Sequence, residues 1–226
     1  MIAGITGPTT VLEEYKNGVN IAQPFVRTDL REYELKIDPR IKNLTSLAFE
    51  QLKEIMQNVN GIHSHVESHE PAKGYVLYLQ VYAKNKRPIE VKIVAHGTRE
   101  MNTPMPMPAV PAKGQEDCAF CKNTSSMPGY EDAANEYAHV MMSQEKNPLT
   151  ISNAEEQKEV HYGHFFEMPL EKQISLVQAA LKTIEIGAKN ATRYWLICHI
   201  GTEGHQTFGH PHIHILRALG GEEKQI

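Results

Sequence analysis

The chain has 226 residues, 22% of them charged, and a formal net charge of -4. It is long enough to bury a sizeable core, and it has no positive excess that would favour nucleic acid or an anionic membrane. No apolar run approaches the roughly 20 residues that cross a bilayer, and the first residues lack the pattern of a secretory signal. Three cysteines are too few for a disulfide scaffold. We therefore expect a cytoplasmic protein with no membrane partner, and the sequence gives no strong sign of nucleic-acid binding.

Residues 1–100 predict a small α+β domain whose role the sequence does not indicate. The apolar side chains of residues 44–56 recur on one face of a helix. Residues 75–83 and 89–95 are rich in β-forming side chains and flank a polar turn, which predicts a hairpin. His63, His65 and His69 lie between helix and hairpin. A metal site is one interpretation, but no cysteine or clear carboxylate pattern accompanies them, so we expect a solvated loop.

Residues 101–117 separate the two parts of the chain. Four prolines in this segment, Pro104, Pro106, Pro108 and Pro111, favour extended backbone, and no periodic apolar face is present. We expect a linker or strap here, followed by a second domain over residues 118–226.

The second domain begins with a predicted strand at residues 136–142, followed by a polar stretch over 143–160. Residues 168–187 give the strongest helix pattern of the chain, with Pro169 in the first turn and Gly187 as a stop. Residues 193–200 predict a strand by their aromatic and branched content. A polar, glycine-bounded turn then leads into the last strand.

That last strand carries three histidines at alternate positions, His210, His212 and His214. Successive strand residues point to opposite faces, so the three imidazoles share one face. Burying a polar ring without a partner costs roughly 1–3 kcal/mol, so the three rings need metal, phosphate or water. A metallo-hydrolase of the HxHxDH type would need an aspartate where this chain continues as Ile215, Leu216 and Arg217. A satisfied, histidine-rich surface strand is the simpler alternative.

Cys118 and Cys121 have the two-residue spacing that lets both thiolates bind one tetrahedral zinc ion. A redox dithiol is the rival interpretation, but it would require a thioredoxin-like βαβ pattern around the cysteines. Two further ligands must come from histidine, and the chain offers His161, His164 and the three alternating histidines. We expect a structural Zn²⁺ site, and the set we predict is Cys118, Cys121, His164 and His210.

His212 and His214 then remain for a reaction. Neutral imidazole is a good nucleophile near pH 7, and a second imidazole on the same face can hold an anion beside it. Gln206 and Thr207, in the preceding turn, can add further donors. This combination suits attack on a phosphorus centre whose negative oxygens are held by preorganised donors.

The run "HPHIHIL" at residues 210–216 resembles the histidine triad (HIT) superfamily, whose signature is His-φ-His-φ-His-φ-φ with φ apolar. The resemblance extends to "GHQTFGHPHIHILRALGG" and to "CAFCK", which is similar to the opening of the zinc-containing branch. It covers residues 118–221. It implies an α+β fold with a five-stranded antiparallel sheet and a long helix, commonly assembled as a homodimer.

The resemblance also implies a role for each site residue. His212 would take a nucleotidyl group from an α-phosphate, and His214 and Gln206 would contact phosphate or leaving group. Thr207 would add a donor, Phe120 would line the base pocket, and Glu145 stands where the family often binds ribose. His199 replaces a typical asparagine, and the uridylyltransferase branch typically has glutamine where this chain has His214.

The sequence therefore predicts an enzyme that hydrolyses or transfers nucleotides through a covalent nucleotidyl-histidine. Its expected partner is a purine nucleotide or nucleotide conjugate. A nucleoside phosphoramidate and a dinucleoside polyphosphate remain open as substrates. The alternative is a non-catalytic, zinc-stabilised module that senses nucleotides or binds another protein.

Overall fold

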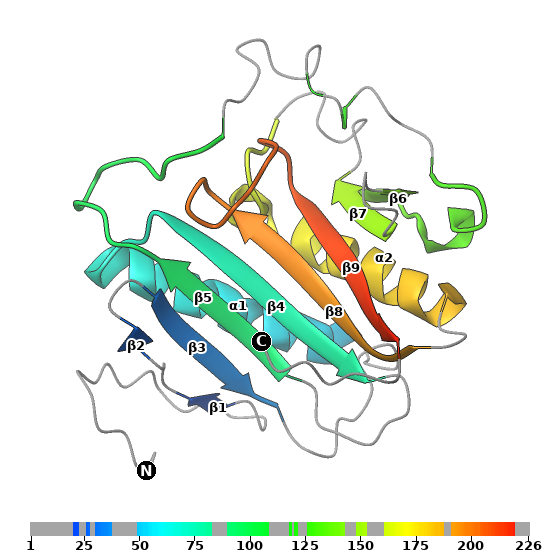
Figure 1. Ribbon diagram of the computed structural model, residues 1–226, viewed down its shortest axis with the longest axis horizontal. Coiled ribbons are helices and arrows are strands. Elements are labelled where there is room, and N and C mark those ends of the chain that lie inside the picture. The colour runs from blue at the N-terminus through cyan, green and yellow to red at the C-terminus, as the bar shows by residue number, and fades with distance from the viewer. Residues whose placement is uncertain are drawn as a thin grey trace.

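In the computed structural model, a single antiparallel sheet runs through both halves of the chain (Figure 1). The structure describes residues 20–22, 26–27, 30–37, 49–82, 90–108, 118, 120–121, 126–142, 148–152, 161–187 and 191–219. Among them, nine strands share the sheet, and eight lie in the order β1-β3-β5-β4-β8-β9-β7-β6 while β2 pairs with β3. The expected five-stranded sheet is therefore wrong, because β4 of the first half pairs directly with β8 of the second.

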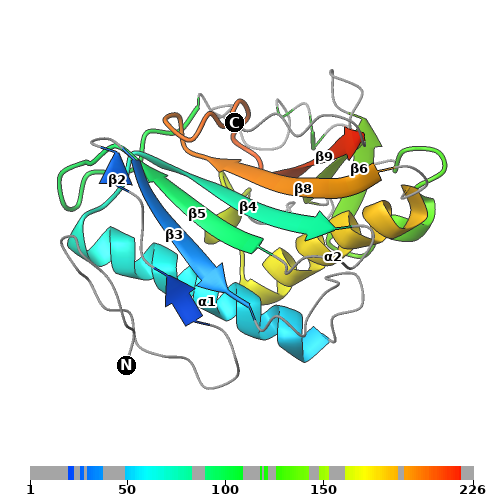
Figure 2. The ribbon, with the colours of Figure 1, turned by 60° about the horizontal axis from the view of Figure 1, so that its bottom comes forward.

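The first half contains β1 (Asn20–Ala22), β2 (Val26–Arg27), β3 (Leu30–Lys36), α1 (Phe49–His69), β4 (Gly74–Tyr82) and β5 (Glu90–His96). The second half contains η3 (Glu131–Ala133), β6 (Ala138–Met142), β7 (Pro148–Ser152), η5 (Phe165–Glu167), α2 (Leu170–Gly187), β8 (Ala191–Ile200) and β9 (His212–Leu219). Both α-helices lie on the same face of the sheet (Figure 2). Among the described residues, neither helix is long and apolar enough to cross a membrane.

The two halves repeat one connectivity. In each half, strands come first, then a long helix, then two paired strands, and the last two strands lie toward the centre of the sheet. In this scheme β3, α1, β4 and β5 correspond to β7, α2, β8 and β9. The register between β4 and β8 runs from Tyr75↔Ile200 to Tyr82↔Arg193, so the halves meet along a full-length pair of strands.

Helix α1 continues well beyond its predicted end. Met56, Val59, Ile62 and Val66 are at most 1% exposed and continue one apolar stripe, so burial holds the helix together past Gly61. Glycine inside a helix costs about 1 kcal/mol, which the buried stripe offsets.

The solvated loop expected around His63, His65 and His69 is therefore wrong, because all three residues lie in α1. The polar residues between Ile62 and Val66 obscure the helical pattern of this segment in the sequence. His65 and His69 contact each other with ring centroids 4.2 Å apart, whereas His63 stacks on Phe166.

The predicted hairpin is confirmed as β4 and β5, and the strong helix pattern as α2. The strands predicted at residues 136–142 and 193–200 appear as β6 and β8. Strand β7 was not predicted, since the stretch around it reads as polar; its short apolar core pairs with β6 and β9. Strands β1 to β3 also went unpredicted.

The strap can be described only as far as residue 108, and residues 109–117 lie outside the described residues. Its described part lies against the loop that follows β8, because the Thr202 amide donates a 2.7 Å hydrogen bond to the Pro106 carbonyl. Met105 packs against the main core. The division into separate domains stays a prediction, although the sheet itself is continuous across it.

Strand alternation gives the sheet two different faces. In β8, Tyr194, Leu196, Cys198 and Ile200 are buried in the core, so Trp195, Ile197 and His199 point to the other face. In β9, Ile213 and Ile215 are buried in the same core, which places His212 and His214 on the face away from the helices. The candidate site lies on this second face.

Candidate active site and metal centre

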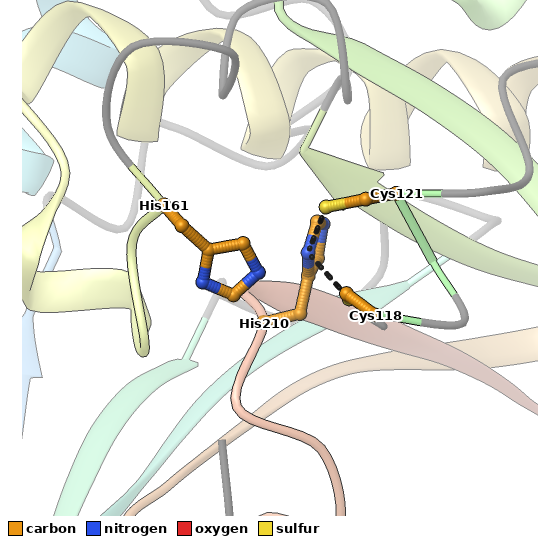
Figure 3. A group of neighbouring side chains, drawn as sticks. All are labelled: Cys118, Cys121, His161 and His210. Atoms are coloured by element: carbon orange, nitrogen blue, oxygen red, sulfur yellow. Dashed lines mark hydrogen bonds between the residues drawn. The ribbon is translucent and has the colours of Figure 1, made fainter. Parts of the chain in front are cut away.

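Cys118, Cys121, His161 and His210 come together at the start of β9 (Figure 3). One ligand atom from each lies within 4.8 Å of those of the others. The His210 Nδ1 atom is 3.5 Å from the Cys118 sulfur and 3.6 Å from the Cys121 sulfur. Sulfur and nitrogen ligands of one tetrahedral zinc ion are about 3.5 Å apart, given the usual bond lengths. The spacing therefore fits a zinc site.

The surroundings of these four residues also fit a metal. Both cysteines are at most 9% exposed and His210 is fully buried, while the His161 Nε2 atom is buried without a hydrogen-bond partner among the described residues. Hydrogen bonding between the thiols lowers the pKa of Cys118 and raises the pKa of Cys121. Such a pair holds one proton, which a divalent cation would displace.

The structure places His161, and not His164, with the cysteines. His164 precedes the short helix η5, and its Nε2 atom lies 3.4 Å from a carboxylate oxygen of Glu167. It is 9% exposed, and burial lowers its pKa. Its Nδ1 atom has no partner among the described residues. The sequence alone does not distinguish the two histidines as metal ligands, because the direction of each side chain depends on the turn at Gly163.

His212 is held in one tautomer by the backbone. Its Nδ1 atom is 2.7 Å from the carbonyl oxygen of His210, and a carbonyl only accepts, so Nδ1 carries the hydrogen. The Nε2 atom of the neutral ring therefore keeps its lone pair. Burial lowers the pKa of His212 to about 3, against the hydrogen bond to His210, so the ring is neutral near pH 7.

Two rings flank His212. The His214 ring centroid is 5.0 Å away and nearly perpendicular, and the Phe120 centroid is 5.5 Å away. Phe120 is 8% exposed and also contacts Phe208, which is 42% exposed, with centroids 4.9 Å apart. Phe208 is not among the site residues predicted from the sequence, although it lies two residues before His210. The two phenylalanines give an apolar surface beside the nucleophile candidate.

Gln206 is fully engaged with the backbone. Its Nε2 atom donates to the carbonyls of Gly163 and Phe208, both at 2.6 Å, and its Oε1 atom accepts from the Gly201 amide at 2.9 Å. The side chain is 4% exposed. In this arrangement Gln206 ties the turn before β9 to the segment that carries His161. Thr207 is exposed on the same turn, and Glu145 lies outside the described residues.

We expect the Gln206→Ala variant to be destabilised by about 3 kcal/mol, at about 1 kcal/mol for each of three lost hydrogen bonds. Urea unfolding would measure the change. The Gln173→Ala variant is the control for the loss of a buried glutamine outside the site, because Gln173 is also buried but lies on α2. A Gln206→Ala protein of unchanged stability with weakened nucleotide binding would instead indicate direct contact with phosphate.

No protein-family model matches this chain, and no curated protein matches it. Solved structures match in fold. A uridylyltransferase mutant superposes with a TM-score of 0.58 at 12% identity, covering 90% of this chain and 75% of that chain. The ADP-glucose phosphorylase of Arabidopsis thaliana, solved with bound ADP-glucose, gives 0.58 at 12% identity over 91% and 74%. A second uridylyltransferase structure gives 0.55 at 12% over 88% and 69%. The shared fold therefore extends through both halves of the chain.

Proposed function

We propose that the protein is an enzyme of the histidine triad superfamily that acts at the α-phosphate of a nucleotide through a covalent nucleotidyl-His212. The observation that carries this proposal is the fixed tautomer of His212, which leaves the Nε2 lone pair available beside a second imidazole on the face of the sheet away from the helices. The fold shared with a uridylyltransferase and an ADP-glucose phosphorylase supports it.

In the first step, the Nε2 lone pair of His212 attacks the α-phosphorus, and the bond from phosphorus to the leaving group breaks. The leaving group keeps the bonding electrons, and a protonated His214 beside it can supply the proton. In the second step, water attacks phosphorus, the P–N bond breaks and the nucleoside monophosphate leaves. His212 returns neutral, and the proton of the attacking water passes to His214, which restores the proton that His214 gave to the leaving group.

A Zn²⁺ ion held by Cys118, Cys121, His161 and His210 would be structural. It would hold these four side chains together, fix the start of β9 and take no part in the reaction. His210 would then act in two ways at once, because its ring would bind the metal while its carbonyl accepts the His212 hydrogen bond. Metal binding would thus fix the orientation of the nucleophile.

Among possible acceptors of the nucleotidyl group, we favour water. The uridylyltransferase branch that this chain resembles typically has glutamine where His214 stands, and an imidazole can carry a proton to the leaving group where an amide cannot. Phe120 and Phe208 offer a surface for the base of a purine nucleotide or conjugate. The homodimer, and a ribose contact from Glu145, remain parts of the proposal that come from the resemblance.

One observation favours the second candidate, a nucleotide-sensing module without catalysis. His212 is 2% exposed and the Gln206 amide is already used by the backbone, so a nucleotide must displace groups to reach the lone pair. A sensor would bind AMP and leave a substrate intact.

Intact-mass spectrometry after brief incubation with adenosine phosphoramidate distinguishes the two candidates. We expect an adenylyl adduct, or rapid AMP release, from the wild-type protein and from the His69→Ala control, whose substitution lies on the exposed part of α1. We expect neither from His212→Ala. AMP binding by the wild-type protein with no adduct and no release would favour the sensing module.

A further inference from the structure

A cavity lies on the face of the sheet that the helices cover. Its volume is about 170 Å³, and it lies between the last turn of α2 and the edge of the sheet where β8 begins and β9 ends. Its lining includes Ile184 of α2, Tyr194 of β8 and Ile215 of β9. Ile215 is buried in the core, so it points to the face opposite to that of its neighbour His214. The sheet therefore separates this cavity from the candidate active site.

One end of the cavity is polar. Tyr194 and Arg217 are directly paired in the β8–β9 register, and both line the cavity. Side chains of two residues paired in this way start about 5 Å apart on one face. The Tyr194 hydroxyl is buried and has no hydrogen-bond partner among the described residues. Burial raises the pKa of Tyr194, and the nearby positive charge of Arg217 opposes this rise. The two side chains thus place an unused hydroxyl donor beside a cation.

The walls between the two ends of the cavity are apolar. Met127, Ile184 and Ile215 contribute apolar side chains. Thr183 also lines the cavity, but its hydroxyl donates a 2.8 Å hydrogen bond to the carbonyl of Ala179. The hydroxyl hydrogen of Thr183 is therefore already used within α2, and these walls suit the apolar part of a ligand.

The other end of the cavity is formed by Tyr130 and the end of α2. A Cβ atom at Gly187 would lie 2.9 Å from the Tyr130 hydroxyl oxygen and 3.5 Å from its Cε1 atom. The absence of a side chain at Gly187 therefore lets the Tyr130 ring lie directly against the last turn of the helix. The last carbonyls of a helix carry partial negative charge. A negative group of a ligand is disfavoured at this end and favoured at the Arg217 end.

Size and charge together define the ligand that fits. A cavity of roughly 150 Å³ is enough to hold a benzene ring. Among the described residues that line the cavity, Arg217 is the only charged one, which favours a ligand with a single negative charge. A carboxylate matches the planar guanidinium with two parallel hydrogen bonds. A phosphate monoester carries about 1.5 to 2 negative charges at pH 7, more than one arginine compensates.

We propose that this cavity binds a small aromatic monocarboxylate of about the size of benzoate. Its carboxylate accepts hydrogen bonds from Arg217 and Tyr194, and its ring lies among the apolar walls. The rings of Tyr130 and Tyr194 favour an aromatic ligand over an aliphatic one, because aromatic rings attract each other edge to face. The described part of the lining has no histidine, cysteine or carboxylate, so the ligand is held and not transformed. Binding here does not depend on the proposed function.

Benzoate is the probe, and methyl NMR of the full-length, zinc-loaded protein is the readout. We expect saturable shifts of the methyl signals of Met127, Ile184 and Ile215, with a Kd of about 1 mM or below for a ligand this small. The Arg217→Gln variant should bind benzoate at least about tenfold more weakly, the size of one lost charge-assisted hydrogen bond. Benzyl alcohol, a neutral analogue, should bind the wild type and this variant within about twofold of each other.

The Arg193→Gln variant is the matched control, because Arg193 precedes Tyr194 in β8 and its guanidinium lies over the Trp195 ring on the opposite face. It should bind benzoate as the wild type does. The Tyr194→Phe variant, which lacks only the hydroxyl, should bind benzoate about threefold more weakly or worse. Methyl signals that stay unchanged up to about 20 mM benzoate, or equal affinities of the wild-type and Arg217→Gln proteins, would overturn the proposal.

Discussion

Replacing His212 with alanine is expected to lower kcat/KM for AMP release by at least about 10³-fold, because loss of the attacking nucleophile removes the covalent route. The Nδ1 hydrogen of His212 is held by the carbonyl of His210, which leaves the Nε2 lone pair for the attack. His214, whose ring lies nearly perpendicular at 5.0 Å, serves the leaving group in the proposed mechanism and is not expected to replace His212.

The measurement is steady-state release of AMP, with AMP affinity and zinc content determined on the same preparation. AMP affinity should stay within about threefold of the wild type, because the lost interaction belongs mainly to the transition state. A variant that keeps its zinc and more than a tenth of the wild-type rate, about 1.4 kcal/mol, would contradict the covalent mechanism. If the His212→Ala variant loses zinc, its low activity would reflect a change in the fold. The His212→Asn variant, which keeps a hydrogen-bonding side chain, then provides the comparison with the wild type.

The second large effect concerns the metal. The His161→Ala variant is expected to bind zinc at least about 100-fold more weakly, because loss of a direct ligand should exceed the 10- to 100-fold cost of losing an outer partner. The His164→Ala variant should retain about one zinc per chain, since His164 instead lies beside Glu167. Zinc titration against a chromophoric chelator measures both.

Zinc loss should also reduce activity, because His210 positions the His212 hydrogen bond. Apo-protein prepared with a chelator should therefore lose AMP release and recover it when Zn²⁺ is restored. If His164→Ala loses zinc while His161→Ala keeps it, the ligand set is the one first expected from the sequence.

Periodicity in the sequence was enough to predict the elements that bear the site. Strand β9 and helix α2 follow from alternating histidines and from an apolar stripe closed by Gly187, and the cysteine pair follows from its spacing. The extent of α1 was not predictable in this way, because the continuation past Gly61 depends on burial of Ile62 and Val66 against the sheet. Local propensity contains no such tertiary term.

The choice between His161 and His164 was beyond the sequence for a related reason. Both residues precede the same helix, and the direction of each side chain depends on the turn at η5, where Phe165 is buried in the core. The role of Gln206 was hidden as well, because its partners, Gly163 and Gly201, are brought to it only by the tertiary fold. Strand pairing between β4 and β8 likewise joins residues more than a hundred positions apart.

The matched connectivity of the two halves has a consequence for stoichiometry. A symmetric pair of identical modules would offer two nucleophile strands on one sheet. Here β5 takes the place of β9 in the first half, and its open face carries Glu90, Lys92 and Val94, with His96 at its end. Under the proposed function, the described strands therefore hold one reactive histidine, His212, and a saturating nucleotide should bind once per polypeptide, with the first half acting as a scaffold for the second.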